Sequence, residues 1–464
     1  MASIREITNK DGNITFQVTV TEKRDRNGKQ KRHCKTFSPP ETWSYKRRRK
    51  AAEDFGRDYE REIEKGFDVN NKQTFAEYAE YVLALKESNK KKVRTIEFYR
   101  ELLARINAAI GHKLLTEIRP THLNAFYINL SEPGQRIGNA KATLKPSFDI
   151  VAALKEKGLS RNKLAGLSNV SPATITNVLQ GKRVNKSVAD SVSAALDLKI
   201  HKIFTIEENQ EPLSTKTILE HHRLISTILK QAEDDMIVTY NAAKKAKPPE
   251  YIAPEAEIFQ PDDVIAIRDA LESENIKWKT LTHMLLITGC RRGEIAGLMW
   301  DRVDWDNSMI KIDKALLQSK TKGIYDDTTK TSTTRHIKLP YETMTLLKEY
   351  KQWYLELEEH NGDRWQNSGY VFVKDDGSCI RPDSITKWLS KFSKRRNLPH
   401  IHPHKFRHTM ASLLYFNGID SVAISKRLGH AKVSTTSDMY AHITNQSDER
   451  ASESIADVIL RTAT

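Results

Sequence analysis

The first 67 residues show short stretches in which apolar and polar positions alternate, followed by one longer helical pattern. Alternation with a period of two is typical of half-buried strands. It predicts three strands, over Ser3–Thr8, Ile14–Thr21 and Gln30–Phe37. Asp11-Gly12 and Asn27-Gly28 separate them, and both dipeptides favour tight hairpin turns. A helix over Tyr45–Lys65 follows. We therefore expect residues 1–67 to form a three-stranded sheet backed by one helix.

Between residues 74 and 130 the apolar positions recur every three or four residues, which is the spacing of amphipathic helices. The first such set is Phe75, Tyr78, Tyr81, Val82 and Leu85. The pattern stops near Leu130 and resumes at Ser214–Glu233, which opens with a good helix N-cap. We expect residues 74–130 and 213–246 to form one helical domain that is interrupted in the sequence.

The interrupting segment, residues 131–212, contains short helices separated by turn residues. Ser160 and Ser171 can each cap a helix, and Pro172 stands at the first position of the second helix, where it costs no hydrogen bond. This is the spacing of a helix-turn-helix, whose second helix enters the major groove of DNA. The outward-facing candidates for DNA contact are Ser171, Ala173, Thr174, Asn177 and Lys182.

With a flanking helix on each side, over Phe148–Lys157 and Ser187–Leu196, the segment resembles repressor domains of the Cro/LacI-like kind. The stretch VSPATITNVLQGK carries that resemblance. Such bundles can also become protein-contact modules, and the sequence leaves both uses open.

A proline-rich stretch over Ala246–Ala256 indicates a linker. Helical patterns and then alternating apolar positions follow it. The strands expected there are Met309–Asp313, Tyr325–Thr329 and Arg335–Leu339. The fold class predicted for the whole chain is therefore multidomain and mainly α with small β-sheets, ending in an α+β domain over residues 257–464.

Composition narrows the class of partner. A chain of 464 residues is too long for one compact core, and its formal net charge of +15 favours a polyanion, nucleic acid ahead of a membrane surface. The three cysteines show no CxxC spacing, so neither a disulfide framework nor a zinc knuckle is expected. Without an apolar run of about 20 residues or a signal-peptide core, no membrane partner is expected. We expect a cytoplasmic protein, because scattered cysteines are typical of a reducing compartment.

The helix over Tyr45–Lys65 opens with five consecutive basic residues, Lys46, Arg47, Arg48, Arg49 and Lys50. A small sheet backed by a helix can lay its strands into a DNA groove, so we expect residues 1–67 to contact DNA. The alternative is a structural cap whose basic run is a solvated face.

The candidate chemistry is concentrated near the end of the chain. His404 and Arg407 are three positions apart, so they share a helix face, and both can donate hydrogen bonds to phosphate oxygens. His430 follows in a Leu-Gly-His tripeptide. Tyr440 stands after a polar run that offers no core to fill, and its hydroxyl can act as a nucleophile on a neutralised phosphate. These residues suggest covalent chemistry on a phosphodiester.

Two upstream segments can complete such a site. Arg291 stands at an expected helix start, where its guanidinium group can donate two hydrogen bonds to a phosphate, and Glu294 can orient that group. The alternative is an ordinary surface ion pair. Lys330 is a candidate proton donor to a leaving hydroxyl, because a cationic, desolvated site lowers the pKa of lysine. The histidines at 402, 404 and 408 do not indicate a metal site, since no carboxylate accompanies them. No cofactor is expected.

Together these motifs resemble the tyrosine recombinases, the integrase family of phages and mobile elements. The motifs, in order, are TGCRRGE, KTSTTRHIKLP, HPHKFRH, LGH and the polar run that ends in Tyr440. Each is weak alone, whereas all five in order are specific, and the resemblance covers nearly everything outside residues 131–212. Cys290 departs from the family pattern, which usually has an apolar residue such as Leu there, and the helix-turn-helix insertion is unusual.

The resemblance implies a role for each residue. Tyr440 attacks the scissile phosphate and leaves a 3′-phosphotyrosyl link, while Arg291 and Arg407 bind the non-bridging oxygens. Lys330 protonates the leaving 5′ oxygen. His404 accepts the tyrosine proton, and His430 donates a hydrogen bond to the phosphate. Arg292 is a DNA or structural contact. The reaction needs neither a metal ion nor ATP.

The resemblance also implies the organisation and the partners. Residues 1–67 correspond to an arm-binding domain, residues 74–130 and 213–246 to a core-binding domain, and residues 257–464 to the catalytic domain. The expected partners are double-stranded attachment sites and three further copies in a homotetramer, with an excisionase or a DNA-bending protein as further candidates. The alternatives are a type IB topoisomerase-like enzyme and a helix-turn-helix regulator with an inactive catalytic half.

Overall fold

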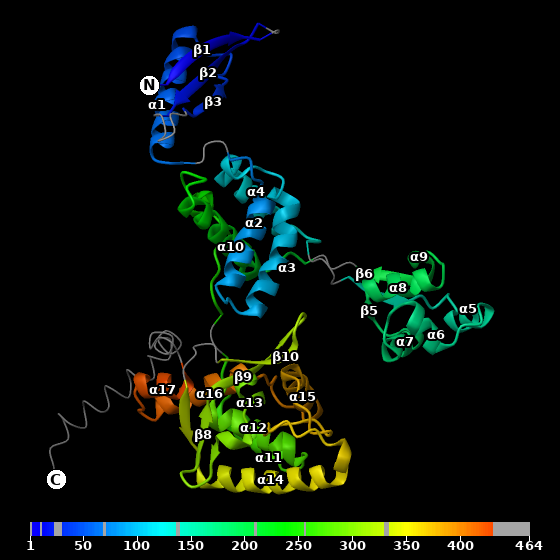
Figure 1. Ribbon diagram of the computed structural model, residues 1–464. Helices are drawn as coiled ribbons and strands as arrows, with labels where there is room; N and C mark the ends of the chain where they lie inside the picture. Colours follow the sequence, from blue (N-terminus) through cyan, green and yellow to red (C-terminus); the bar gives the residue numbers. More distant parts are fainter. Residues whose placement is uncertain are drawn as a thin grey trace, which may run out of the picture. The chain divides into compact units, whose positions relative to one another are not determined.

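The structure is a computed structural model that describes residues 2–9, 12–22, 30–67, 71–135, 140–207, 211–254, 257–328 and 334–429. It divides into two compact units, Met1–Ile252 and Ala253–Thr464. Both are mostly helical with small antiparallel sheets (Figure 1), as predicted. No helix among the described residues is long and apolar enough to cross a membrane.

The first described elements are β1 (Ser3–Thr8), β2 (Ile14–Thr21), β3 (Arg32–Phe37) and α1 (Tyr45–Glu64). The strands form an antiparallel sheet in the order β1-β2-β3. The alternation in β2 turns Val18 and Val20 to one face, where they pack against Tyr59 and Ile63 of α1. The sequence predicted these elements, although β3 begins two residues later than expected, at Arg32, which pairs with Thr21 at the end of β2.

A helical core follows, built from segments on both sides of residues 131–212. Its elements are α2 (Phe75–Ser88), α3 (Val93–Ile110), η1 (Leu115–Glu117), α4 (Pro120–Leu130), α10 (Thr215–Asp234) and η2 (Ala242–Lys245). The Tyr78 hydroxyl on α2 donates to Oδ2 of Asp235 at 2.6 Å, and the Tyr127 hydroxyl on α4 lies 2.9 Å from Nδ1 of His222 on α10. These bonds join α10 to helices that precede it by about ninety residues or more in the sequence.

Residues 140–207 pack around a hydrophobic core of their own that includes Leu164, Ile175 and Phe204. The elements are β4 (Lys141–Leu144), α5 (Ile150–Glu156), α6 (Arg161–Leu167), α7 (Pro172–Leu179), β5 (Val184–Asn185), α8 (Lys186–Ala195), α9 (Ile200–Ile203) and β6 (Phe204–Glu207). The prediction of helices alone was incomplete, because β5, β4 and β6 form a sheet. β4 and β6 come from opposite ends of the segment, so no local pattern announces their pairing.

The second unit carries the remaining elements. They are α11 (Pro261–Leu271), α12 (Ile276–Thr288), α13 (Arg292–Ala296), η3 (Trp300–Arg302), β7 (Val303–Asp304), β8 (Met309–Ile312), β9 (Lys314–Ser319), β10 (Gly323–Thr328), β11 (Arg335–Lys338), α14 (Tyr341–Asn361), η4 (Gly362–Arg364), α15 (Pro382–Arg395), α16 (Pro403–Phe416) and α17 (Ser421–Leu428). Strand β9 was not predicted. Its consecutive residues Ala315 and Leu316 are both buried, so the strand lacks the alternation of buried and exposed positions from which strands are predicted.

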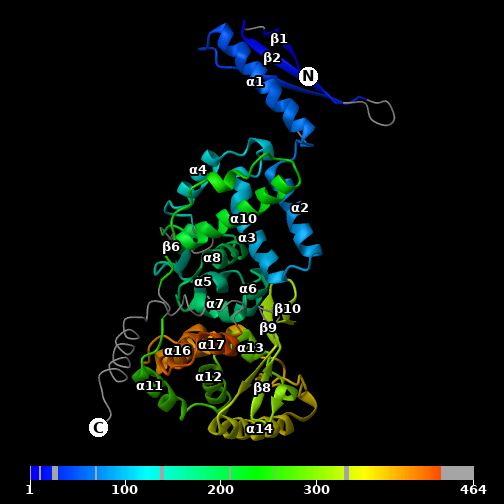
Figure 2. The same cartoon turned by 90° about the vertical axis from the view of Figure 1, so that its left-hand side faces the viewer.

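Helix α12 forms the centre of this unit. It contacts α14 on one side and α16 on the other, and Figures 1 and 2 show α14 and the pair α16 and α17 on opposite sides of the unit. Leu281, Met284 and Leu285 of α12 are fully buried. The end of α12 is thereby fixed beside α16, which is where the predicted catalytic residues are.

Separate cores predict separate responses to core mutations. Ile225→Ala on α10 should destabilise the helical core by about 2–5 kcal/mol, because it leaves a cavity, and should speed amide hydrogen exchange in α2, α3 and α10. Ile175→Ala on α7 is the matched variant and should speed exchange only within residues 140–207. Exchange that rises in both regions with either variant would contradict the independence of the two cores.

Candidate active site

A tight turn between α12 and α13 positions the first predicted arginine. Gly289 ends α12 with a φ of 60°, a conformation that favours glycine. A Cβ at this position would lie 2.2 Å from Cε of Met410 on α16 and 2.9 Å from Cδ2 of Leu428 on α17. The backbone therefore passes close to both helices, and Arg291 stands immediately before the first residue of α13.

Glu294 accepts hydrogen bonds from two arginines in the interior. Its side chain is 1% exposed, Oε1 accepts from Nη1 of Arg291 at 2.8 Å, and Oε2 accepts from Nη2 of Arg335 at 2.6 Å. Oε2 also accepts from the backbone N–H of Arg291 at 2.9 Å. Burial would raise the pKa of Glu294, but the hydrogen bond and charge of Arg335, together with Arg291, hold that pKa below its ordinary value. The predicted orienting contact between Glu294 and Arg291 is present.

Arg407 lies on α16 and is buried. Its Nη1 donates to the carbonyl oxygen of Gly289 at 2.8 Å, and its Nη2 donates to that of Leu428 at 2.7 Å. Burial and then the charge of Arg291 lower the pKa of Arg407 to about 10, so the group stays charged at neutral pH. The guanidinium groups of Arg291 and Arg407 are therefore close enough for their charges to repel. Such a pair of donors binds anions.

His404 begins the same helix and is exposed, in contrast to Arg407 one turn later. Partial desolvation, then the charge of Arg407, lowers the pKa of His404 below 6.5. At neutral pH its imidazole is therefore uncharged and able to accept a proton. His402 has a different part: it is the N-cap of α16, and its Nδ1 accepts from the backbone N–H of Lys405 at 3.3 Å.

Arg292 points to α15, where it pairs with Asp383 at 3.0 Å and donates to the Thr386 hydroxyl at 2.9 Å. This geometry supports the structural half of the expectation for Arg292. No three His, Cys, Asp or Glu side chains gather as a metal site within the described ranges. Lys330, His430 and Tyr440 lie outside those ranges.

Arg335 was not among the predicted site residues, although the KTSTTRHIKLP motif contains it. The sequence did contain a signal for this residue, because the alternation of apolar and polar positions places Arg335 with Ile337 on the buried face of β11. An arginine on the buried face of a strand needs an interior acid, which here is Glu294. The sequence alone did not pair them because 41 positions separate the two residues.

The candidate DNA contacts of the first unit lie on surfaces but are partly engaged. On α1, the Arg47 guanidinium stacks over the Trp43 ring at 4.3 Å, and Arg48 Nε donates to the Trp43 carbonyl at 2.7 Å. On α7, Ser171 caps the helix by accepting from the backbone N–H of Thr174 at 3.2 Å. Arg49 is exposed and pairs with Glu53 on the same helix at 3.5 Å. The other exposed candidates are Lys46, Lys50, Ala173, Asn177 and Lys182.

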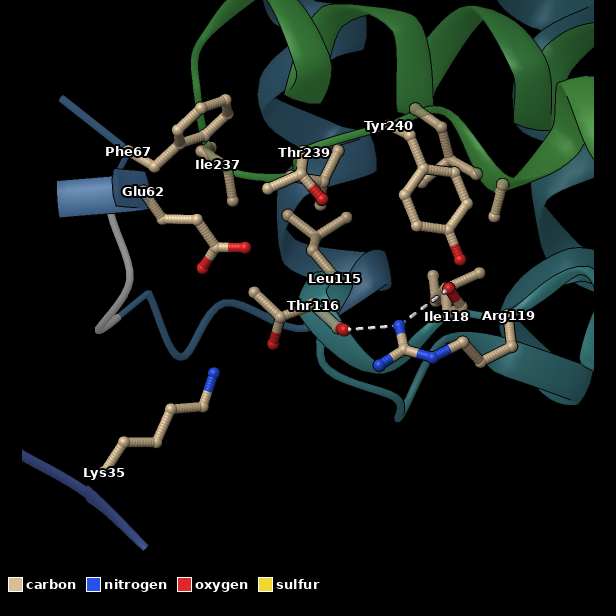
Figure 3. Close-up of a pocket in the computed structure, with 13 residues that line it drawn as sticks. Lys35, Glu62, Phe67, Leu115, Thr116, Ile118, Arg119, Ile237, Thr239 and Tyr240 are labelled. Atoms are coloured by element: carbon tan, nitrogen blue, oxygen red, sulfur yellow. Dashed lines mark hydrogen bonds between the residues drawn. The ribbon is translucent and has the colours of Figure 1, made fainter. Parts of the chain in front are cut away.

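The first unit also contains a hollow that Figure 3 shows at close range. Arg119 lines it and donates to the carbonyl oxygens of Thr116, at 2.8 Å, and Ile118, at 3.4 Å. None of the predicted catalytic residues lines this hollow. All of the predicted catalytic residues belong to the second unit.

The pKa directions give a direct test of the histidines. Carbon-13 NMR of histidine-labelled protein should show His404 titrating below pH 6.5 and His408 near pH 4, because burial lowers the pKa of His408 to about 4. His404→Gln and His408→Gln assign the two resonances. A His404 that is protonated at pH 7 in the DNA-free protein would contradict its assignment as a proton acceptor.

Comparison with known proteins adds three findings. The model of the phage integrase family matches residues 257–447. A XerC-like tyrosine recombinase of Caldanaerobacter subterraneus is 26% identical over 269 residues, covering 54% of this chain and 68% of the relative. The ICEBs1 integrase of Bacillus subtilis is 27% identical over 249 residues, covering 53% of this chain and 67% of that protein.

Among solved structures, the Tn1549 transposon integrase in complex with transposon right-end DNA superposes with a TM-score of 0.56 at 18% sequence identity, covering 83% of this chain and all of that one. At this identity the likeness concerns the fold. The family match spans the part of the second unit that holds Arg291, Glu294 and Arg407, and the curated relatives are similar over about half of this chain. Residues 257–447 are therefore a domain of the phage integrase family, and the chain is similar to tyrosine recombinases.

Proposed function

We propose that this chain is the integrase of a mobile element and that it cuts and rejoins double-stranded DNA at attachment sites through a 3′-phosphotyrosyl intermediate. The observation that carries the proposal is the arginine pair. Arg291 immediately precedes α13 and Arg407 lies on α16, and the two guanidinium groups are held by Glu294 and by backbone carbonyls. A phosphodiester with two non-bridging oxygens is the anion that matches two such donors.

In the proposed reaction the Tyr440 hydroxyl attacks the scissile phosphorus and the bond to the 5′ oxygen breaks. His404 accepts the tyrosine proton, and Lys330 donates a proton to the leaving 5′ oxygen. Arg291, Arg407 and His430 hydrogen-bond the phosphoryl oxygens, whose negative charge grows in the transition state. Attack by a 5′ hydroxyl from a second strand reverses these steps and completes the exchange.

Neither ATP nor a metal ion is needed in this scheme. The phosphotyrosyl link keeps the energy of the broken phosphodiester, so rejoining requires no further input. The guanidinium groups supply the positive charge that a metal ion supplies in other phosphoryl-transfer sites.

The remaining domains are proposed to grip the DNA. Residues 1–67 contact it through the basic start of α1, residues 74–130 and 213–246 hold the core site, and residues 257–464 cut it. Exchange between two duplexes involves four strand cuts, which favours a homotetramer on DNA, assisted by an excisionase or a DNA-bending protein. We place this reaction in the cytoplasm of a bacterial host.

We also propose that residues 131–212 form a helix-turn-helix domain that recognises DNA through α7. Asn169 adopts a φ of 51° in the turn between α6 and α7, a conformation that asparagine tolerates well. Ile175 and Val178 of α7 are buried while Asn177 is exposed, so α7 keeps a polar face outward, and Lys182 is exposed just beyond the end of the helix. Asparagine can pair with adenine in the major groove, and lysine can contact phosphate.

A covalent adduct tests the enzymatic proposal. Purified protein and a nicked suicide substrate in EDTA should give an adduct that survives SDS, and Tyr440→Phe should give none. Arg407→Gln should slow adduct formation by about 100-fold or more, since it removes a donor to the transition-state phosphate.

His402→Asn is the control for these variants, because asparagine preserves the helix cap, and it should react at close to the wild-type rate. Wild-type protein that binds attachment-site DNA tightly without forming an adduct would contradict the enzymatic proposal. Relaxation of supercoils without exchange between two sites would favour the topoisomerase-like alternative.

A binding experiment tests the role of α7. Sequences selected from random DNA by the full-length protein should include a motif whose binding falls about tenfold or more in Asn177→Ala, because a lost amide–adenine pair costs about 1–3 kcal/mol. Lys182→Ala should weaken binding and reduce its salt dependence, unlike Lys202→Ala on α9. Identical selected motifs from wild type and Asn177→Ala would show that α7 does not recognise sequence.

A further inference from the structure

Three guanidinium groups donate to three successive backbone carbonyls at the end of α17. Arg335 Nε donates to the carbonyl of Arg427 at 2.9 Å, Arg407 Nη2 to that of Leu428 at 2.7 Å, and Arg291 Nη2 to that of Gly429 at 3.4 Å. The last carbonyls of a helix lack partners within the helix and carry the negative end of its dipole. The end of α17 therefore binds all three arginines.

Arg335 connects this helix end to Glu294. Its side chain is 6% exposed, and its Nη2 donates to Oε2 of Glu294 while Oε1 of the same carboxylate holds Arg291. Glu294 lies in the first turn of α13, Arg335 on β11 and the accepting carbonyls at the end of α17. Three elements that are distant in the sequence are thus joined through one planar guanidinium group.

Gly429 leaves room for this contact. Its φ is 65°, and a Cβ at that position would lie 3.0 Å from Nη1 of Arg335. A residue other than glycine would need a strained backbone and would also press on the buried guanidinium group. The glycine of the Leu-Gly-His tripeptide therefore permits the close approach of Arg335.

We propose that Arg335 is a positioning residue for the recombination reaction. Arg335 holds Glu294 and the end of α17 at once, and in this way it sets the orientation of Arg291 toward the scissile phosphate. This inference rests on the proposed function. Arg335 does not touch the reacting atoms and acts through Glu294. Without it, the carboxylate loses its shortest charged contact and is held only by the side chain and the backbone N–H of Arg291, so its orientation and that of Nη1 of Arg291 are less well fixed.

A lysine at this position would keep the charge but not the geometry. One ammonium group is a point donor and does not present the fork that joins a carboxylate to a backbone carbonyl. Arg335→Lys should therefore fall between wild type and Arg335→Met. This order separates positioning from the simple need for a positive charge.

The test compares two suicide substrates under single-turnover conditions with saturating DNA. One has an ordinary scissile phosphodiester, and the other has a methylphosphonate there, which lacks the negative charge that the arginines must bind. Arg335→Met should slow adduct formation on the phosphodiester by about 10- to 100-fold, the order expected for a misplaced catalytic group. The loss on the methylphosphonate should be much smaller.

Two further variants make the result specific. Arg427→Met is the matched control, since Arg427 Nη2 donates to the carbonyl of Ile287 and Arg427 sits at the same helix end. It should slow both substrates by the same factor. The double variant Arg335→Met with Glu294→Gln should be no slower than the slower single variant, because both changes break one contact chain.

Equal losses on both substrates for Arg335→Met, or a wild-type rate, would overturn the inference while leaving the proposed function intact. If Arg335→Met does not fold, as judged by circular dichroism, the same substrate comparison with Arg335→Lys decides. A wild-type protein that forms no adduct with either substrate would instead overturn the proposed function and this inference with it.

Discussion

A single buried carboxylate, that of Glu294, lies between the guanidinium groups of Arg291 and Arg335, and the geometry of the site depends on it. Arg407 adds a third positive charge nearby and donates to backbone carbonyls. Concentrating like charges in the interior is unfavourable unless an anion compensates them. The site is therefore built with an excess of positive charge that a phosphate can neutralise, and its other interactions hold the donors in place before that phosphate arrives.

Parts of the candidate site could be predicted from the sequence where the residues are neighbours on one element. Arg291 and Glu294 are three positions apart, as are His404 and Arg407, and the helices that carry them were recognised from local spacing. Arg335 was missed because its acid lies on another element. Strand β9 and the β4–β6 pair were missed for related reasons: two-sided burial hides the alternation in β9, and the β4–β6 pairing joins the two ends of a segment of more than sixty residues. The family resemblance supplied the role of His430 and made the roles expected for Lys330 and Tyr440 specific to the two oxygens of a scissile phosphodiester.

The β4–β6 pairing also explains how the first unit accommodates an inserted segment. Ala142 pairs with Ile206, so the chain enters and leaves residues 140–207 on adjacent antiparallel strands. An insertion whose ends lie side by side places little strain on the elements that flank it. Helices α4 and α10 can then pack as if they were consecutive, as the contact between Tyr127 and His222 shows. The first unit can thus contain residues 140–207, with a hydrophobic core of their own, without disturbing the helical core formed by the segments on either side.

The most direct measurement is to identify the residue that becomes linked to DNA. Adduct formed with a nicked substrate in the presence of EDTA would be digested with protease and nuclease, and the modified peptide sequenced by mass spectrometry. The account predicts one modified residue, Tyr440, joined to a 3′ phosphate. A link to any other residue, or an adduct that forms only when a divalent metal ion is added, would contradict it.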